Sequence, residues 1–260
     1  MQNLFSLKFD AIYMLTLCEN KLRHKAMQKM FNHIGLDLTS INIHYGCKFP
    51  YNNIIMDAFN NNSEKRCFTK PNEYDCARNH YSIIKEAYEL GYNNVLILED
   101  DIQFNKDLSL LRNTLTNIPK DYDILQFGAF TVDPNINEIL DKSNENIYWS
   151  LHPNVKVWTT SMYALSRVGM QYYLKFMDKW FTVADMPLYY APINKVKAYL
   201  TTTPIVIQAD KNTTPSDIRT PLTDTIDYNN DNLYESRVNK NQYFSYEITE
   251  INNAHNNTKN

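Results

Sequence analysis

The chain has 260 residues, a hydrophobic fraction of 43%, a charged fraction of 21% and a formal net charge of -3. These values fit a soluble globular protein with a sizeable core, folded as one large α/β domain or two small ones, and they give no basic signature of nucleic-acid binding. The sequence has few glycines (5) and contains no GxGxxG or P-loop pattern. Any anionic ligand would therefore be held by local donors or by a metal ion.

The four cysteines have no CxxC spacing, so the sequence gives no indication of a zinc ribbon or a thioredoxin-like motif. We expect free, partly buried thiols, because a Cys47–Cys67 or Cys67–Cys76 bridge would need an oxidising compartment. Residues 1–20 lack the pattern of a signal peptide, and no run approaches the ~20 apolar residues that span a bilayer. We therefore expect a cytoplasmic protein with no transmembrane segment, at most peripheral at the inner face of a membrane.

Apolar periodicity in the first half predicts strands that alternate with helices. The predicted helices carry apolar residues at the i, i+3, i+4 spacing and are ended by Gly35, Gly91 and Pro119. In chain order the elements are a strand at 11–17, a helix at 21–34, a strand at 41–45, a surface loop at 46–75, a helix at 76–90, a strand at 94–98, a helix at 107–118 and a strand at 122–127. This order predicts an α/β fold with a mostly parallel, Rossmann-like sheet and helices on both faces.

The second half has a weaker pattern. We expect irregular structure at 131–152, a strand at 157–165, a helix with Ser166 as its N-cap, and strands at 197–200 and 205–208. Without a clear linker, one domain over 1–260 is the simpler interpretation. It would comprise a nucleotide-binding half at about 8–130, an acceptor-binding half at about 131–220 and a polar, partly disordered tail at about 221–260.

The strongest chemical signal is a run of three carboxylates, Glu99, Asp100 and Asp101, directly after a buried strand. Adjacent acids repel one another by roughly a kcal/mol or more per close pair, and a divalent cation would offset that repulsion. In an open α/β sheet, ligands bind at the carboxyl ends of the strands. Because side chains alternate along a strand, Glu99 and Asp101 would face one way and Asp100 the other, so two acids can converge on one ion. A solvated junction between strand and loop is an equally good interpretation of this stretch alone.

Segments along most of the chain resemble glycosyltransferase family 25, the lipooligosaccharide and collagen-type galactosyltransferases, in their order and spacing. These segments are Ile12–Leu17 with Arg23, Cys76–His80, Val95–Asp101, Asp123–Gly128, Tyr163–Ser166, the surroundings of Asp185, and Ile207–Gln208 with Ser216–Ile218. The sequence departs from the family where Asn79 replaces the usual serine before His80 and Leu22 the usual aspartate before Arg23. Residues 184–187 match the family's Asp-Trp region loosely.

The resemblance implies a GT-A type fold and the transfer, with inversion, of a hexose such as galactose or glucose from a UDP-sugar. A Mn²⁺ or Mg²⁺ ion would stabilise the leaving diphosphate and would be bound by oxygen ligands, with Asp101 as the main ligand and Asp100 and Gln208 as further ones. The residues expected to border the nucleotide sugar are Thr16, Leu17, Arg23, His80, Glu99, Asp100, Ser216 and Asp217.

An inverting transfer also needs a base that takes the proton of the acceptor hydroxyl. Asp185, a lone acid between apolar residues in the second half, is the predicted base, because it stands at the family's corresponding position. A helix N-terminal acid favoured by the helix dipole is its alternative role. Arg23 and His80 have structural alternatives too, as a solvated first-turn arginine and as a histidine satisfied inside the core.

The expected acceptor is a glycan such as lipooligosaccharide, with hydroxylysine on a collagen-like protein as the alternative. Two other classes stay open. A metal-dependent phosphohydrolase or nucleotidyltransferase could use the same acids, although the six histidines are scattered along the sequence. A catalytically inactive relative that binds a nucleotide sugar is the other class, and the altered Leu22 and Asn79 leave it open.

Overall fold

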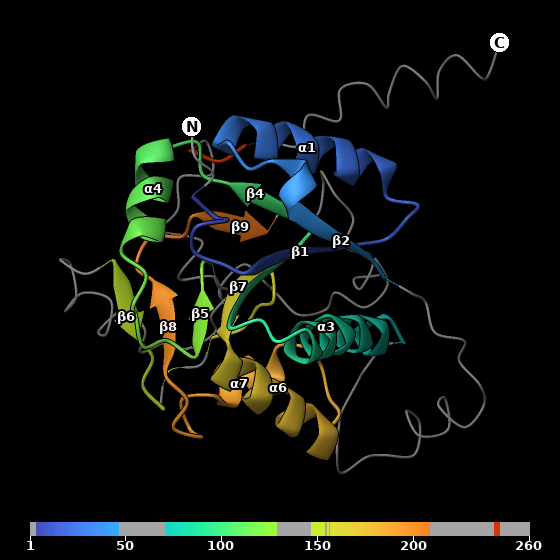
Figure 1. Ribbon diagram of the computed structural model, residues 1–260, viewed down its shortest axis with the longest axis vertical. Coiled ribbons are helices and arrows are strands. Elements are labelled where there is room, and N and C mark those ends of the chain that lie inside the picture. Colours follow the sequence, from blue (N-terminus) through green and yellow to red (C-terminus); the bar gives the residue numbers. More distant parts are fainter. Residues whose placement is uncertain are drawn as a thin grey trace, which may run out of the picture.

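A seven-stranded sheet in the order β2-β1-β3-β7-β5-β8-β6 forms the centre of the protein (Figure 1). The computed structural model describes residues 4–46, 71–128, 147–208 without 154 and 156, and 242–244. The strands of this sheet are β1 (Ala11–Thr16), β2 (Ile41–Tyr45), β3 (Asn94–Glu99), β5 (Ile124–Gln126), β6 (Tyr148–Ser150), β7 (Met162–Ser166) and β8 (Ala198–Thr201). A separate two-stranded sheet pairs β4 (Ile102–Phe104) with β9 (Val206–Gln208).

The central sheet is mostly parallel, as predicted. Strands β2, β1, β3, β5 and β8 share one direction, whereas β7 runs antiparallel between β3 and β5, and β6 runs antiparallel at the edge beside β8. The carboxyl ends of β1, β3 and β5 therefore lie at the same edge of the sheet as the amino end of β7. This edge is where an α/β sheet binds its ligands.

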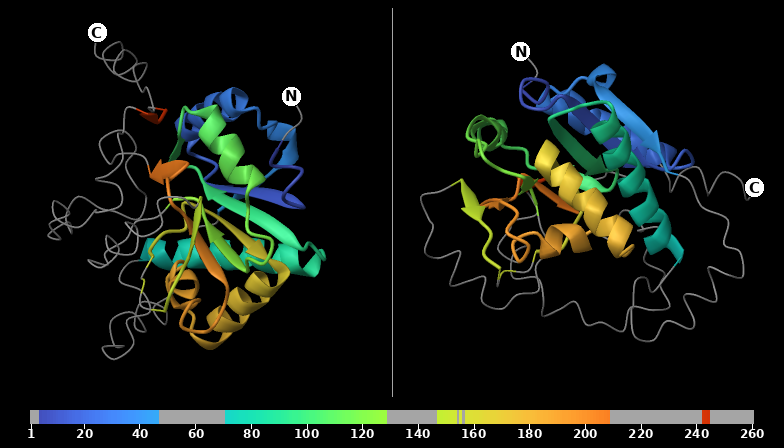
Figure 2. Two further views of the ribbon diagram at one scale, coloured as in Figure 1. Left: turned by 90° about the vertical axis from the view of Figure 1, so that its left-hand side faces the viewer. Right: turned by 60° about the horizontal axis from the view of Figure 1, so that its bottom comes forward.

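Helices cover both faces of the sheet, which confirms the predicted α/β class. One face packs against α1 (Lys21–Ile34) and α4 (Leu108–Thr116), and the other packs against α3 (Pro71–Glu89), α6 (Arg167–Lys179) and α7 (Met186–Tyr190) (Figures 1 and 2). Alternate side chains of β1 show this division, since Met14 joins the α1 side of the core and Tyr13 joins the α3 side. The strands are thus buried on both faces, as continuous apolar runs require.

Local signals set several helix ends where they were predicted. Helix α1 ends at Gly35, whose φ of 73° is in the left-handed region that a glycine adopts without strain. Helix α6 begins after Ser166, whose side chain accepts a hydrogen bond from the backbone N–H of Gly169 at 3.1 Å. The predicted boundaries of α1 and β2 agree with the structure, and α4 and β5 are each shorter than predicted.

Other predicted boundaries are wrong. Helix α3 begins at Pro71, so the predicted loop cannot extend to residue 75; proline is common at the first helical position, and Glu73 in the first turn favours a helix N-terminus. The strand predicted at 157–165 forms only over Met162–Ser166, because Thr159 has a φ of 153°, outside the range of a strand. Part of the region predicted to be irregular is a strand, β6, and β4 was not predicted.

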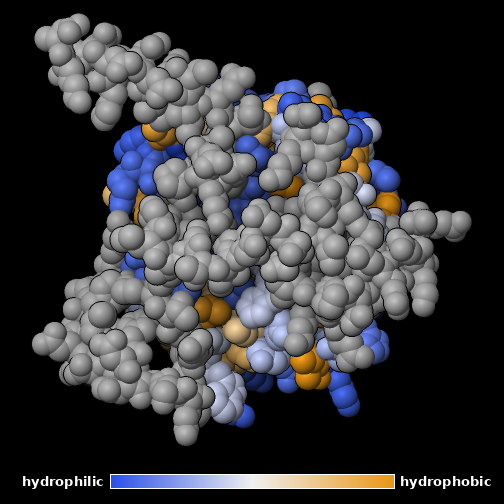
Figure 3. Space-filling model, turned by 180° about the vertical axis from the view of Figure 1, so that it is seen from behind, coloured by the Kyte–Doolittle hydropathy of each residue, from blue (hydrophilic) through white to orange (hydrophobic). Residues whose placement is uncertain are grey.

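The predicted polar tail lies almost entirely outside the described residues, as do residues 47–70 of the predicted loop. Within the tail, residues 242–244 pack against β4: Tyr243 is buried and donates a hydrogen bond to the carbonyl oxygen of Pro204 at 2.7 Å. Hydrophilic and hydrophobic side chains are interspersed over the coloured part of the surface in Figure 3. Among the described helices, none has the length and apolar content needed to cross a bilayer.

The close contact between α6 and the loop before β5 gives the first testable prediction. A Cβ atom at Gly169 would overlap the backbone carbonyl oxygen of Asp123. Gly169→Ala should therefore lower the free energy of unfolding by about 1–3 kcal/mol. At a solvent-exposed position inside a helix, the same substitution would instead raise the free energy of unfolding, because alanine favours the helix more than glycine does. Urea unfolding measures the difference. Val168→Ala, at a neighbouring position that is 59% exposed, is the matched control and should change stability little. Equal stability of Gly169→Ala and the parent would contradict this packing.

Candidate active site

The three predicted acids lie where β3 ends, but they do not continue the strand. Strand β3 stops at Glu99, and Asp100 and Asp101 form a turn into β4. The predicted alternation of side chains holds for Glu99 and Asp100, which are bound from opposite faces of the sheet, but its extended backbone does not continue to Asp101. Instead, hydrogen bonds direct the three side chains toward different elements of the fold.

Asp100 connects β3 to the first strand and helix. Its Oδ1 accepts a hydrogen bond from Arg23 Nη1 at 2.8 Å, and its Oδ2 accepts from Thr16 Oγ1 at 2.5 Å and from Asn20 Nδ2 at 3.2 Å. Thr16 Oγ1 also lies 2.7 Å from His24 Nε2. Asp100 is 4% exposed and the Arg23 side chain 12% exposed, so Arg23 is not a solvated surface residue. This ion pair fixes the turn between β1 and α1 against the acidic cluster.

Glu99 is bound from the opposite side of the sheet. Its Oε1 accepts a hydrogen bond from Thr160 Oγ1 at 2.6 Å and lies 3.1 Å from His80 Nε2, while His80 Nδ1 lies 2.9 Å from the Tyr163 hydroxyl. Burial alone would raise the pKa of Glu99, but the hydrogen bond and charge of His80, with help from Thr160, outweigh it and lower that pKa. His80 is fully buried, so its predicted contact with donor would have to be made through Glu99.

Asp101 is the least compensated of the three acids. It is 7% exposed, and its Oδ2 accepts one hydrogen bond, from Gln208 Nε2 at 3.2 Å. Its Oδ1 is buried without a hydrogen-bond partner among the described residues. Burial, and then the charge of Glu99, raise the pKa of Asp101 to about 7. Carboxylate and amide oxygens of this kind are ligands that a hard divalent cation prefers, so the residues present fit the predicted metal ion.

The predicted ligand Gln208 is brought to this position by the small sheet. Gln208 ends β9, and it is the register partner of Ile102 in β4, directly after the acidic turn. The structure therefore places Gln208 beside Asp101, although 107 positions separate them in the sequence.

Asp185 lies directly before α7 and is half-buried. Its side chain makes no capping hydrogen bond to this helix, so it does not act as an N-cap in the usual way. Burial, followed by the charges of Glu99 and Glu73, raises the pKa of Asp185 to about 6, although a hydrogen bond within its own residue and the charge of His80 oppose the shift. Asp185 is thus electrostatically coupled to the acidic cluster.

The remaining predicted residues differ in how far the structure describes them. Leu17 follows β1, and its carbonyl oxygen accepts a hydrogen bond from the backbone N–H of Asn20 at 3.0 Å, which shapes the turn that Asp100 fixes. Ser216 and Asp217 lie outside the described residues.

Sequence reasoning missed two buried polar residues at this edge of the sheet. Thr160 contacts Glu99 directly, but no local pattern marks it, because the contact depends on the pairing of β7 with β3. Gln126 ends the buried strand β5 and is fully buried; its Nε2 donates to the carbonyl oxygen of Thr159 at 3.2 Å, and its Oε1 has no hydrogen-bond partner in the described part of the chain. A polar residue at the carboxyl end of a buried parallel strand was the signal that could have identified Gln126.

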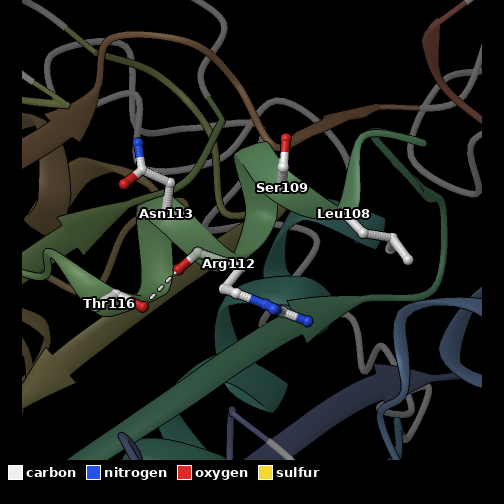
Figure 4. Close-up of a pocket in the computed structure, with 5 residues that line it drawn as sticks. All are labelled: Leu108, Ser109, Arg112, Asn113 and Thr116. Atoms are coloured by element: carbon white, nitrogen blue, oxygen red, sulfur yellow. Dashed lines mark hydrogen bonds between the residues drawn. The ribbon is translucent and has the colours of Figure 1, made fainter. Parts of the chain in front are cut away.

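A surface hollow along α4 is not part of this site. None of the residues predicted to bind donor, metal or acceptor lines it (Figure 4). The side chains that line it come from α4, namely Leu108, Ser109, Arg112, Asn113 and Thr116. The Thr116 hydroxyl in this hollow donates to the carbonyl oxygen of Arg112 at 2.8 Å, within the same helix.

The acidic cluster thus lies at the carboxyl edge of a mostly parallel sheet, where α/β folds bind their ligands. Residues 9–188 match the model of glycosyltransferase family 25, described as an LPS biosynthesis protein. The match covers more than half of the chain, and the chain belongs to this family. It is therefore a glycosyltransferase built on the mostly parallel α/β sheet described above, and the predicted family, enzyme class and α/β class are confirmed.

Among solved structures, the chain is similar to three transferases at low identity. The first is a glycosyltransferase involved in the glycosylation of the major capsid of PBCV-1 (10% identity, 73% of this chain and 81% of that chain covered, TM-score 0.39). The second is the mannose-1-phosphate geranyltransferase of Thermus thermophilus (10% identity, 74% of this chain and 72% of that chain covered, TM-score 0.34). The third is mouse xyloside xylosyltransferase 1 in its apo form (8% identity, 71% of this chain and 80% of that chain covered, TM-score 0.30). No curated protein sequence matches the chain.

The raised pKa of Asp101 predicts that this residue destabilises the metal-free protein. Because its pKa is higher in the folded chain (about 7) than its ordinary value of 3.8, folding binds a proton, and stability is lost as the pH rises through both values. In the presence of a chelator, Asp101→Asn should raise the free energy of unfolding by about 1–3 kcal/mol at about pH 8, and the gain should shrink toward pH 4. Urea unfolding at several pH values measures this.

Asp100→Asn is the matched control for that experiment. It removes one partner of a buried ion pair and should lower the free energy of unfolding by about 3–5 kcal/mol. If Asp101→Asn also lowered the free energy of unfolding, and did so at every pH, Asp101 would have a structural role. The metal site would then lie elsewhere.

Proposed function

We propose that the chain transfers a hexose, galactose or glucose, from a UDP-sugar to a hydroxyl group of a glycan acceptor such as lipooligosaccharide, with inversion at the anomeric carbon. Membership in glycosyltransferase family 25 supports the reaction class. The observation that carries the proposal is Asp101, a buried carboxylate with one partnerless oxygen, among the described residues, at the ligand-binding edge of the sheet.

In this proposal, Asp101 is the main ligand of a Mn²⁺ or Mg²⁺ ion, and Gln208 and Asp100 are further candidates. Gln208 supports this role because it lies beside Asp101 and comes from a different part of the chain. Asp100 is engaged with Thr16 and Arg23, which suits an anchoring role better than full coordination. When bound, the divalent cation supplies charge that stabilises the leaving diphosphate.

The donor would lie along the turn that follows β1. Thr16 and Arg23 are held there by Asp100, and Leu17 borders the same turn. Glu99, fixed by His80 and Thr160, would orient the donor sugar at the end of β3. Ser216 and Asp217 remain predictions as residues that close over the nucleotide.

Asp185 is the proposed general base. Its carboxylate would take the proton of the acceptor hydroxyl as that oxygen attacks the anomeric carbon, and the bond to UDP would break. A base works best when its pKa lies near the working pH. A half-buried carboxylate with a pKa of about 6 is ionised at neutral pH and is a better proton acceptor than an ordinary aspartate.

Two substitutions should separate donor binding from catalysis. Asp101→Asn should abolish the Mn²⁺-dependent part of UDP binding in isothermal titration. Asp185→Asn should keep that binding while transfer falls by roughly 10²–10⁴, the usual contribution of a general base. Slow hydrolysis of a panel of UDP-sugars identifies the donor and measures turnover.

Each alternative class gives its own result in the same assays. Metal-dependent UDP binding without turnover of any UDP-hexose would indicate an inactive relative, and a parent protein that does not bind UDP would indicate another metal enzyme such as a phosphohydrolase. Transfer to hydroxylysine rather than to a glycan would identify a protein-directed enzyme of the same family. If both variants turned over donor like the parent, the assignment of the site would be wrong.

The pKa of Asp185 predicts the pH dependence of transfer. The base acts in its deprotonated form, so kcat at saturating donor and metal should be constant above about pH 7 and should fall about tenfold per pH unit below pH 6. The residual activity of Asp185→Asn should lack this acidic limb. An acidic limb of the same midpoint in that variant would assign the base to another residue.

A further inference from the structure

A second cluster of potential ligands lies next to the acidic turn and includes neither Asp101 nor Gln208. Cys76 and His80 are four positions apart on α3, so their side chains share one face of the helix. Glu99 approaches this face from the end of β3. The Cys76 sulfur, an imidazole nitrogen of His80 and a carboxylate oxygen of Glu99 all lie within 4.8 Å of one another.

The hydrogen bonds around His80 suit a metal ligand. The Tyr163 hydroxyl lies 2.9 Å from Nδ1, which leaves Nε2 directed at Glu99. Metal-bound histidines commonly have their other ring nitrogen fixed by an oxygen in this way. The separation of 3.1 Å between His80 Nε2 and Glu99 Oε1 is slightly shorter than that of two ligand atoms on one tetrahedral ion, about 3.3–3.4 Å for bonds of about 2.0–2.1 Å.

Cys76 is available for such a role. It is a free cysteine, half-buried, and forms no disulfide. Burial, followed by the negative charges of Glu99, Asp185 and Asp101, raises the pKa of the Cys76 thiol, and a bound cation would lower that pKa again. A cation held by the sulfur would relieve repulsion within this group of acids.

We propose that Cys76, His80 and Glu99 form a second cation site, selective for Zn²⁺ and similar thiophilic ions, that is separate from the hard-cation site at Asp101. A thiolate, an imidazole and a carboxylate are the donor types that bind Zn²⁺, whereas Mn²⁺ and Mg²⁺ prefer oxygen ligands alone. As Zn²⁺ binds, the sulfur–metal bond replaces the S–H bond and the thiol proton passes to solvent. With three protein ligands, the ion keeps one position for water or another ligand.

This inference does not depend on the proposed transfer reaction. A consequence follows if both hold, because Glu99 cannot both coordinate Zn²⁺ and orient the donor sugar. Zn²⁺ should then inhibit transfer without competing with Mn²⁺ for Asp101. Binding, however, is measurable on its own.

The test is isothermal titration of Zn²⁺ into the full chain after treatment with a chelator, together with the absorption spectrum of the Co²⁺-substituted protein. The parent should bind one Zn²⁺ at this site, and the Co²⁺ form should show the near-ultraviolet band of a cobalt–thiolate bond. Cys76→Ser should abolish the band and weaken Zn²⁺ binding by at least about 10–100-fold, the loss that follows even from changing an outer partner of a metal site.

Three further variants make the result specific. Cys18→Ser, at an exposed free cysteine, should leave the Zn²⁺ affinity and the cobalt band unchanged, and Asp101→Asn should keep the cobalt band. Glu99→Gln keeps the size of the side chain and should weaken Zn²⁺ binding. This variant serves as the test in place of Cys76→Ser if circular dichroism shows that Cys76→Ser does not fold. The proposal is overturned if the parent shows no cobalt–thiolate band, or if folded Cys76→Ser binds Zn²⁺ like the parent. Mn²⁺-dependent UDP binding, measured separately, decides the transferase proposal.

Discussion

The placement of three adjacent carboxylates, two of them buried and Glu99 half-buried, is the constraint on which the arrangement of this protein depends. Acids placed side by side in a low-dielectric interior remain ionised only if each has donors or a counter-charge of its own. The fold provides these from separate elements: α1 and β1 supply them to Asp100, α3 and the segment before β7 to Glu99, and β9 to Asp101. Elements far apart in the sequence thus converge on the end of β3.

The compensation is unequal, and this inequality separates structural from chemical roles. Asp100 has a guanidinium, a hydroxyl and an amide as partners, and Glu99 has an imidazole and a hydroxyl. Asp101 has a single amide donor and retains an oxygen with no partner in the described chain. The proposed divalent cation would bind best to a group that gains by its charge, and Asp101, whose own surroundings leave it short of positive charge, is such a group.

Much of the fold could be predicted from local sequence patterns, because a buried strand or an amphipathic helix shows its spacing of apolar residues within a single segment. The bounds of α1, the N-cap Ser166 and the α/β alternation are of this kind. The partners of the acids could not be predicted from local patterns, because they depend on which strands pair. The resemblance to a known family suggested Gln208, but its place beside Asp101 requires the β4–β9 register. Thr160 reaches Glu99 only because β7 runs antiparallel to β3. Thr159 likewise interrupted a strand that propensity favoured, through a backbone angle set by its surroundings.

The direction of β7 has an effect on how such an enzyme can diversify. In a wholly parallel sheet, the loops at the ligand-binding edge all leave strands; here one segment, Trp158–Ser161, instead enters a strand at that edge. Its hydrogen bonds to Glu99 and Gln126 place it between two parallel strands, while β7 itself is held by both neighbours. If Glu99 orients the donor sugar as proposed, substitutions in these four residues would reshape the space around that sugar and leave the sheet intact, so that the segment would be a natural point for changes in substrate preference.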